Sequence, residues 1–172
     1  MVAQAKYEVH KTIAKLEIRK YPKLTIARVD GYGDGGFNLL FNFITGDNRS
    51  RKKVAMTAPV VSQRIEMTAP VLSEGGSLAF VMPDGFTMDN TPVPNDRRVK
   101  IIEIPERYVA ALRFSGRWTD KAFDKRSEEL LSVLEKAGIP LNGTVFAMRY
   151  NGPFTPFFMR RNEVAVEIDF KA

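Results

Sequence analysis

Met56-Thr-Ala-Pro-Val60 is repeated, residue for residue, as Met67-Thr-Ala-Pro-Val71 eleven positions further along the chain. Threonine favours extended structure, and each proline forces extended geometry on the alanine before it while removing one ladder donor. Each copy therefore predicts a short strand that stops at its proline, and the spacing suits two strands joined by a turn near residues 62–64. Composition alone fits an ordinary edge hairpin equally well. The doubling of five residues makes Val54–Leu72 the stretch around which the chain is organised.

Before this stretch, alternating charged and apolar residues predict strands over 15–21 and 24–29. Four glycines then fall within residues 31–36, but a phosphate-binding loop is excluded because its spacing and its Lys-Ser/Thr pair are missing. A short helix follows, with apolar residues at i, i+3, i+4 and i+7, and Gly46 ends it. Its apolar face consists of Phe37, Leu40, Phe41 and Ile44.

After the doubled motif the same order of elements returns. Strands are predicted over 78–82, 98–104, 108–114, 145–150 and 164–170. Thr119 is the predicted N-cap of a helix that extends to about Ala137, where Gly138 and Pro140 stop it.

Strand, glycine turn, helix and two strands thus occur in each half, which indicates an internal duplication. We predict an α+β fold: one domain over residues 1–172, with pseudo-repeats at about 15–83 and 98–170. In such a fold both helices pack against one curved, mostly antiparallel sheet, with a cleft between the halves. A chain of 172 residues is long enough to bury this core without disulfides.

Composition narrows the classes of function. The chain has no cysteine, which excludes disulfides, thiolate metal sites and a cysteine nucleophile. The net charge of +6 raises the question of nucleic acid, but the one dense basic cluster lacks flanking aromatic residues, so no nucleic-acid partner is expected. That cluster consists of Arg49, Arg51, Lys52 and Lys53. No apolar run is long enough to span a membrane, and we expect a soluble, cytoplasmic monomer.

The sequence does not predict an enzyme. The single histidine, His10, lies in a predicted N-terminal strand without a supporting acid motif, so a nucleophile–base pair is missing. Metal-ligand clusters are absent as well. The acids on predicted strands have the spacing of solvent faces or ion pairs, and Glu163, which follows Arg160 and Arg161, predicts a salt bridge that anchors the last strand.

Four segments together resemble the SOUL haem-binding protein family, over about Tyr7 to Phe170. These are the first Met-Thr-Ala-Pro-Val, Leu78-Ala-Phe-Val-Met-Pro83, Arg113-Phe-Ser-Gly116 and Arg160-Arg-Asn-Glu163. The resemblance implies a distorted β-barrel of two βαββ halves, each with a helix, similar to the effector-binding domains of drug-responsive transcription activators. It also implies reversible, non-covalent binding of haem or another tetrapyrrole in an apolar groove beside the first helix.

A porphyrin needs a flat apolar slot and cations near its carboxylates. The face Phe37, Leu40, Phe41 and Ile44 would form one wall, although core packing explains such a stripe equally well. Phe154, Phe157 and Phe158, on a loop over residues 152–158, would form a mobile lip. Arg49, Arg51, Lys52 or Lys53 would neutralise the propionates.

The iron ligand is where this sequence departs from the resemblance. No histidine stands at the start of the first helix, and residues 37–45 lack the basic side chains that relatives project there. His10, Tyr32, Met56, Met67 and Met159 are the candidate ligands; packing explains the tyrosine and the methionines better than ligation does, and His10 is better explained as an ordinary strand histidine. We therefore expect largely hydrophobic haem binding without a required axial protein ligand. Two alternatives stay open: an effector-binding module for an apolar cation, and a protein-interaction module that uses the Phe-rich loop.

Overall fold

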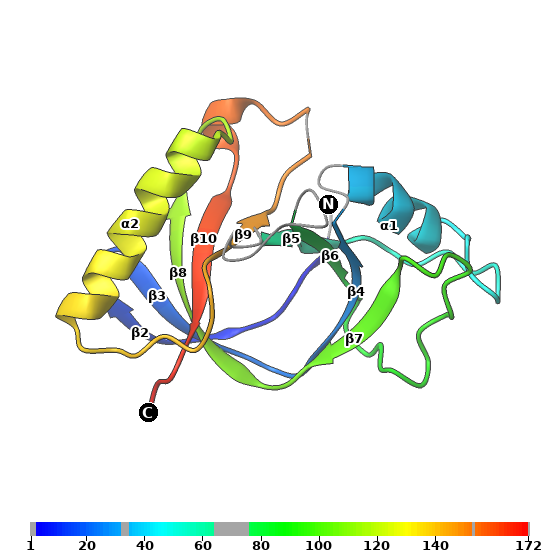
Figure 1. Ribbon diagram of the computed structural model, residues 1–172, viewed down its shortest axis with the longest axis horizontal. Helices are drawn as coiled ribbons and strands as arrows, with labels where there is room; N and C mark the ends of the chain where they lie inside the picture. The colour runs from blue at the N-terminus through cyan, green and yellow to red at the C-terminus, as the bar shows by residue number, and fades with distance from the viewer. Residues whose placement is uncertain (1–2, 32–34, 64–75, 153, 172) are drawn as a thin grey trace. The chain divides into compact units, whose positions relative to one another are not determined.

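The computed structural model describes residues 3–31, 35–63, 76–152 and 154–171 (Figure 1). The second copy of the doubled motif and Tyr32 lie outside the described residues. In chain order the elements are β1 (Ala3–Gln4), β2 (Glu8–Ile13), β3 (Leu16–Tyr21), β4 (Leu24–Asp30), α1 (Gly36–Ile44), β5 (Thr57–Gln63), β6 (Ser77–Val81), β7 (Lys100–Ile104), β8 (Arg107–Phe114), α2 (Asp120–Lys136), β9 (Phe146–Arg149), the 3₁₀ turn η2 (Phe157–Met159) and β10 (Asn162–Ile168).

The chain forms two compact units, each with a sheet and one helix. Unit 1 comprises residues 1–5 and 23–105, and unit 2 comprises residues 6–22 and 106–172. In unit 1 the strands pair in the order β7-β4-β6-β5, and β1 lies parallel beside β5. In unit 2 the order is β2-β3-β8-β10-β9, antiparallel throughout. The two units therefore share one motif, because β4-α1-β5-β6 and β8-α2-β9-β10 pair their strands in the same way.

The strand at the start of each predicted repeat pairs with a strand of the other repeat. β3 precedes the first helix in the sequence but pairs with β8, and β7 precedes the second helix but pairs with β4. Each unit is thus completed by a strand from the other half of the sequence.

The predicted α+β class, with a mostly antiparallel sheet and two helices, is confirmed, but the predicted barrel is not closed. Among the described strands, β2 pairs only with β3 and β7 only with β4. Five of the six β2 residues are exposed, and their charges suit a solvent-facing edge strand.

The first copy of the doubled motif does not stop at its proline as predicted. β5 runs through Pro59 to Gln63, and its register against β6 shifts between Thr57 and Val60. The irregularity places the proline, which has no N–H to donate, where the ladder is interrupted.

In unit 2, α2 begins and ends where the sequence predicts. The Thr119 hydroxyl accepts a hydrogen bond from the Ala122 amide (3.0 Å), and Gly138 adopts a positive φ of 69° just beyond the helix. Phe123, Leu130 and Leu134 of α2 are buried against one face of the sheet.

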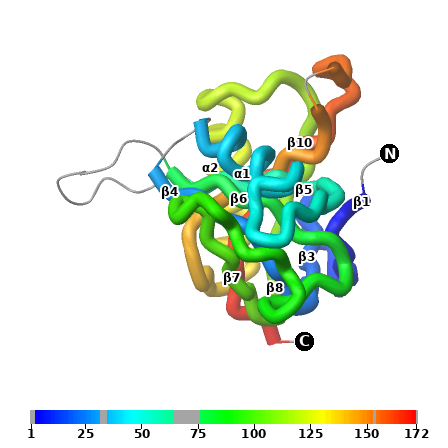
Figure 2. The backbone as a smooth tube through the Cα atoms, turned by 90° about the vertical axis from the view of Figure 1, so that its right-hand side faces the viewer, coloured from blue at the N-terminus to red at the C-terminus, as the bar shows by residue number. Residues whose placement is uncertain are grey.

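In unit 1, α1 lies on β4 and β6 (Figures 1 and 2). Its buried stripe differs from the predicted one and consists of Gly36, Leu40, Phe43 and Ile44. A Cβ atom at Gly36 would lie only 3.6 Å from the Val29 side chain, so the small residue keeps this side of the helix close to the sheet. The helix is therefore rolled toward Gly36 and Phe43, and Phe37 and Phe41 lie at the edge of the buried stripe.

Candidate functional site

The outer edge of α1 carries two partly exposed aromatic rings. Phe37 is 38% exposed and Phe41 is 45% exposed, whereas Leu40 and Ile44 of the same predicted face are buried in the core of unit 1. The structure therefore divides the predicted wall into two residues of the core and two residues that solvent reaches.

The two exposed rings are stacked on one another. Their planes are inclined by 11° with centroids 6.1 Å apart, and Phe37 also meets the buried ring of Phe80 edge-on at 5.2 Å. The contact with Phe80 fixes the orientation of Phe37 against the core. We call Phe37 and Phe41 the aromatic edge of α1; a stacked pair of exposed rings can extend its stack onto a flat apolar ligand.

A basic loop follows the C-terminal end of α1. The side chains of Arg49, Arg51, Lys52 and Lys53 are all exposed. The loop is shaped by Asn48, which is buried: its amide nitrogen donates to the carbonyls of Phe43 (3.0 Å) and Lys52 (2.8 Å), and its oxygen accepts from the Lys52 amide (3.0 Å). Four cations are consequently presented from a backbone that is anchored to the helix end.

In unit 2, the segment between β9 and β10 presents four large apolar side chains to solvent. Phe154, Phe157, Phe158 and Met159 are all exposed. The backbone is fixed beneath them, because Phe157 accepts a hydrogen bond through its carbonyl from the Gly116 amide (2.9 Å) and begins the turn η2. We call these four residues the aromatic loop.

Unit 2 also holds a buried ion pair on the sheet face opposite α2. Arg19 donates to both carboxylate oxygens of Glu163, with Nη1 to Oε1 at 2.8 Å and Nη2 to Oε2 as the second bond. Both side chains are essentially inaccessible to solvent. Arg161 approaches the same carboxylate (Nη2 to Oε2, 3.3 Å), as the sequence predicted, but the principal partner is a residue 144 positions earlier.

Tyrosines surround this pair. The guanidinium of Arg19 lies over the Tyr7 ring at 4.2 Å and donates to the Tyr21 hydroxyl (3.1 Å). Arg161 donates to the Tyr7 hydroxyl at 2.8 Å and lies over the Tyr150 ring at 3.9 Å. No local pattern in the sequence marks these residues as neighbours.

The charges of this cluster are stabilised by one another. Burial by itself would raise the pKa of Glu163, but the hydrogen bonds and charge of Arg19 outweigh it and hold that pKa below its ordinary value. Burial raises the pKa of Tyr150, and the nearby Tyr21 and Glu163 raise it further. Glu163 is therefore ionised and fully engaged by two guanidinium groups, which makes it a structural carboxylate.

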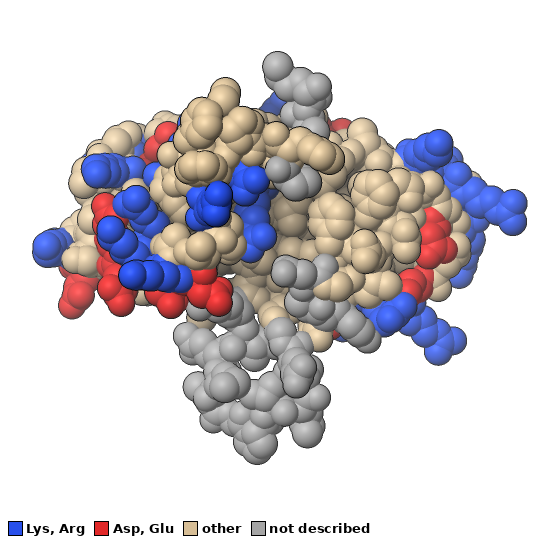
Figure 3. All heavy atoms as spheres, turned by 90° about the horizontal axis from the view of Figure 1, so that it is seen from above, with Lys and Arg blue, Asp and Glu red and all other residues tan. Residues whose placement is uncertain are grey.

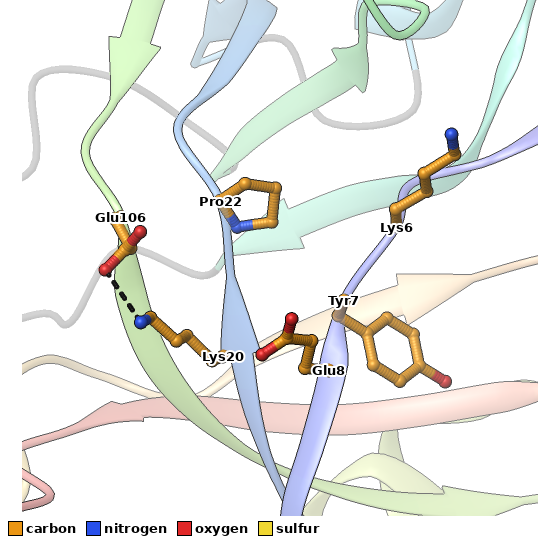
Figure 4. A pocket seen from close by; sticks show the side chains of 6 residues that line it. All are labelled: Lys6, Tyr7, Glu8, Lys20, Pro22 and Glu106. Atoms are coloured by element: carbon orange, nitrogen blue, oxygen red, sulfur yellow. Dashed lines mark ion pairs between the residues drawn. The ribbon is translucent and has the colours of Figure 1, made fainter.

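An open pocket of about 370 Å³ adjoins this cluster at the start of β2, the end of β3 and the start of β8 (Figure 4). It is lined by Lys6, Tyr7, Glu8, Lys20, Pro22 and Glu106. Lys20 pairs with Glu106 at 3.2 Å, and the hydrogen bond with Glu106 raises the pKa of Lys20. The two lysines and two glutamates of the lining balance in charge, so the pocket offers no net positive charge to the carboxylates of a porphyrin.

The candidate iron ligands that the structure describes lie in separate segments of the chain. His10 lies on β2, and its Nε2 is 3.8 Å from Oε2 of Glu8. Its ring meets the Tyr108 ring edge-on, with the two centroids 5.3 Å apart. Met159 belongs to the aromatic loop, Met56 packs at the margin of the unit 1 core, and Tyr32 and Met67 are outside the described residues. Within the ranges that the structure describes, no group of three or more His, Cys, Asp or Glu side chains is placed to hold a metal ion.

Neither described helix combines the length and apolar character that crossing a bilayer requires.

Comparison with known proteins identifies relatives over almost the whole chain. The family model described as SOUL heme-binding protein matches residues 2–167. Heme-binding protein 1 of Sus scrofa is 30% identical over 131 residues, which is 73% of this chain and 65% of that protein.

Solved structures share the fold at low sequence identity. The C-terminal domain of EcmrR is similar with a TM-score of 0.63 and 10% identity, over 95% of this chain and 98% of that one. A hydrolase from Listeria innocua is similar with a TM-score of 0.59 and 11% identity, over 93% of this chain and 94% of that one. At these identities the likeness concerns the fold alone.

Proposed function

The chain belongs to the SOUL heme-binding protein family, and we propose that it binds haem or a related tetrapyrrole non-covalently against the aromatic edge of α1. The observation that carries this proposal is the stacked pair of exposed rings of Phe37 and Phe41. Leaving two phenylalanines of one helix open to water costs stability unless something covers them. A planar macrocycle packed against this stacked pair would take part of the exposed aromatic surface out of water.

The basic loop supplies the second requirement of a porphyrin, which is a cation for each propionate. Arg49, Arg51, Lys52 and Lys53 follow the same helix and are exposed, so their charged ends are free to move toward a bound carboxylate. Binding of this kind depends on salt, whereas binding to the aromatic edge does not. In the proposed complex the macrocycle contributes most of the affinity and the propionates set its orientation.

An axial protein ligand is not part of the proposal. The single histidine is on β2, and no described residue of α1 is a histidine, tyrosine or methionine. The haem chemistry itself would come from the bound group, while the chain provides an apolar surface and counter-charges. That Phe154, Phe157 and Phe158 form a mobile lip over the ligand stays a prediction.

The test is a titration of the purified full chain with haemin, followed by absorbance in the Soret region, and in parallel with protoporphyrin that lacks iron. We expect saturable one-to-one binding of both compounds. Phe41→Ala should weaken both by about five- to tenfold, because it removes roughly half of a phenylalanine's transfer free energy. Arg49→Gln/Lys53→Gln should weaken binding about threefold at low salt and less at high salt.

Met88→Ala is the matched control, since Met88 is 46% exposed in the same unit and belongs to the segment between β6 and β7. It should leave both titrations unchanged. Saturable binding that is indifferent to Phe41→Ala would refute the proposed place of the ligand, and absence of binding by either compound would refute the function.

The alternative of an effector-binding module requires a carboxylate that is available to an apolar cation. Glu163 is the buried carboxylate of unit 2, and Arg19 and Arg161 already neutralise it. A bound cation would have to displace a two-point guanidinium contact, which is unfavourable. This pairing favours the tetrapyrrole over a cationic ligand.

A further inference from the structure

The aromatic loop is an apolar surface that the proposed tetrapyrrole site on α1 does not use. Phe154 is 99% exposed, and Phe158 and Met159 are each 65% exposed. Side chains this accessible stand out from the protein surface instead of lining a groove in it. Contiguous apolar groups of this kind mark an interaction site.

The exposure follows from a defined backbone. Besides the bond from the Gly116 amide to the Phe157 carbonyl, the Met159 amide donates to the Pro156 carbonyl (2.9 Å), and Nε of Arg160 donates to the Thr155 carbonyl (2.9 Å). Figure 1 shows η2 at the end of unit 2 where α2 begins. The turn thus holds the apolar side chains outward at one end of the unit.

Cations outnumber acids in the segments next to the loop, although Asp120 and Glu163 directly follow these segments and Arg107 and Arg161 pair with Glu167 and Glu163. Residues 107–119 and 143–162, the two segments joined by the Gly116–Phe157 hydrogen bond, contain six arginines and neither aspartate nor glutamate. Among them the Arg117 guanidinium lies over the Phe157 ring at 5.1 Å and is exposed. Figure 3, which looks onto this end of unit 2, shows uncharged atoms with Lys and Arg side chains next to them. Apolar side chains with flanking cations match a bilayer that carries anionic headgroups.

We propose that the aromatic loop docks the protein on anionic lipid bilayers, with Phe154 and Phe158 in the interfacial region and Arg117 at the headgroups. A protein partner is less well matched, because hot-spot residues of protein interfaces sit in packed pockets with a rim that excludes water, not on a projecting turn. A second copy of this chain is disfavoured as well: a two-fold contact through the loop would bring the same arginine-rich segments face to face. A bilayer accepts projecting rings and supplies the opposite charge.

The test is co-sedimentation of the full chain with phosphatidylcholine vesicles, with and without phosphatidylserine, in the absence of haem. Trp118, the single tryptophan, adjoins Arg117 and reports contact by energy transfer to a dansyl-labelled lipid. We expect binding to the phosphatidylserine vesicles that weakens with salt. Phe158→Ser should lower the partition coefficient about tenfold, and Phe154→Ser/Phe158→Ser further. Arg117→Gln should lower it about fivefold.

Leu141→Ser is the matched control: Leu141 is 47% exposed in the same unit but is paired with the end of β10, away from η2. It should bind vesicles like the unchanged protein. Equal unfolding midpoints for all variants establish that the loop changes do not act through folding.

Three results would overturn the proposal. These are absence of binding to phosphatidylserine vesicles, unchanged binding by Phe154→Ser/Phe158→Ser, and a concentration-dependent mass that Phe158→Ser abolishes, which would assign the loop to a second copy. The haemin titration without vesicles is a separate measurement. Loss of lipid binding with haemin binding intact refutes this inference alone, and the reverse refutes the tetrapyrrole proposal alone.

Discussion

Replacing Arg19 with methionine tests the buried ion pair directly. The guanidinium contributes two hydrogen bonds to the Glu163 carboxylate, and both side chains are removed from solvent. Methionine fills most of the volume of the arginine stem but leaves the carboxylate buried beside Arg161 alone, 3.3 Å away.

Removing one partner of a buried pair costs about 3–5 kcal/mol of unfolding free energy, because the remaining charge stays desolvated. Arg161 compensates in part, so we expect a loss of about 3 kcal/mol for Arg19→Met. In a chain of 172 residues this corresponds to a fall in Tm of about 6–12 °C. The assay is urea unfolding followed by the fluorescence of Trp118, with thermal unfolding alongside.

The pH dependence of the unfolding free energy provides a second, independent test of the ion pair. In the unchanged protein the pKa of Glu163 is lowered, so its stabilisation is present above its unfolded pKa of about 4.3 and is lost as pH falls through the lower folded pKa. Without Arg19, burial raises that pKa, so the stability of the variant falls as pH rises above about 4. The difference between the two proteins should therefore be larger at neutral pH than in acid.

Arg98→Met is the control, because Arg98 forms an exposed pair with Asp96 at 2.6 Å and such pairs contribute about 1 kcal/mol or less. The double variant Arg19→Met/Glu163→Gln removes the orphaned charge and should be more stable than Arg19→Met. A loss no larger than that of the control, or one that does not change with pH, would show that the carboxylate of Glu163 is not desolvated as described.

Asn48→Ala should cost about 2–3 kcal/mol in urea unfolding, because it removes three hydrogen bonds: two with the peptide groups of Lys52 and one with the Phe43 carbonyl, which keeps only the longer bond from the Gly46 amide (3.4 Å). A loss below about 1 kcal/mol would mean that the basic loop is held in another way. Tyr150→Phe tests how the unfolding free energy changes at alkaline pH. Because burial raises the pKa of Tyr150, its neutral form stabilises the fold below the unfolded pKa of about 10, and this contribution is lost as pH rises from there. The variant should lose less stability than the unchanged protein between neutral pH and about pH 11, and equal slopes would contradict the assignment.

Local pattern was sufficient for the elements of this fold. Thr119, Gly138 and the spacing of Phe123, Leu130 and Leu134 predict α2 closely, because capping and amphipathic periodicity act within a few residues. The strand at 108–114 was predicted for the same reason. Local pattern gave the wrong prediction at Pro59. There β5 continues past the proline because its hydrogen-bond partner is β6, a different segment of the chain.

In the candidate site, too, the sequence predicted some features and only the packed structure decided the others. The sequence placed Phe37, Leu40, Phe41 and Ile44 on one face, and helical spacing alone cannot say how far a helix is rolled on its sheet. Burial of Gly36, Leu40, Phe43 and Ile44 against the sheet decides that, and it leaves Phe37 and Phe41 at the surface. The basic loop was recognised from composition, whereas the buried Asn48 that shapes it was not.

By itself, then, the sequence determined the class of fold, the two helices, the repeated order of elements and the family, because all of these are carried by neighbours along the chain. Only the tertiary structure decided that β3 pairs with β8, that Arg19 neutralises Glu163 from 144 positions away, and which phenylalanines of α1 face water. Those outcomes depend on contacts between segments remote in sequence. Burial and charge pairing are properties of the space around a side chain, and that space is enclosed only when the sheets have formed.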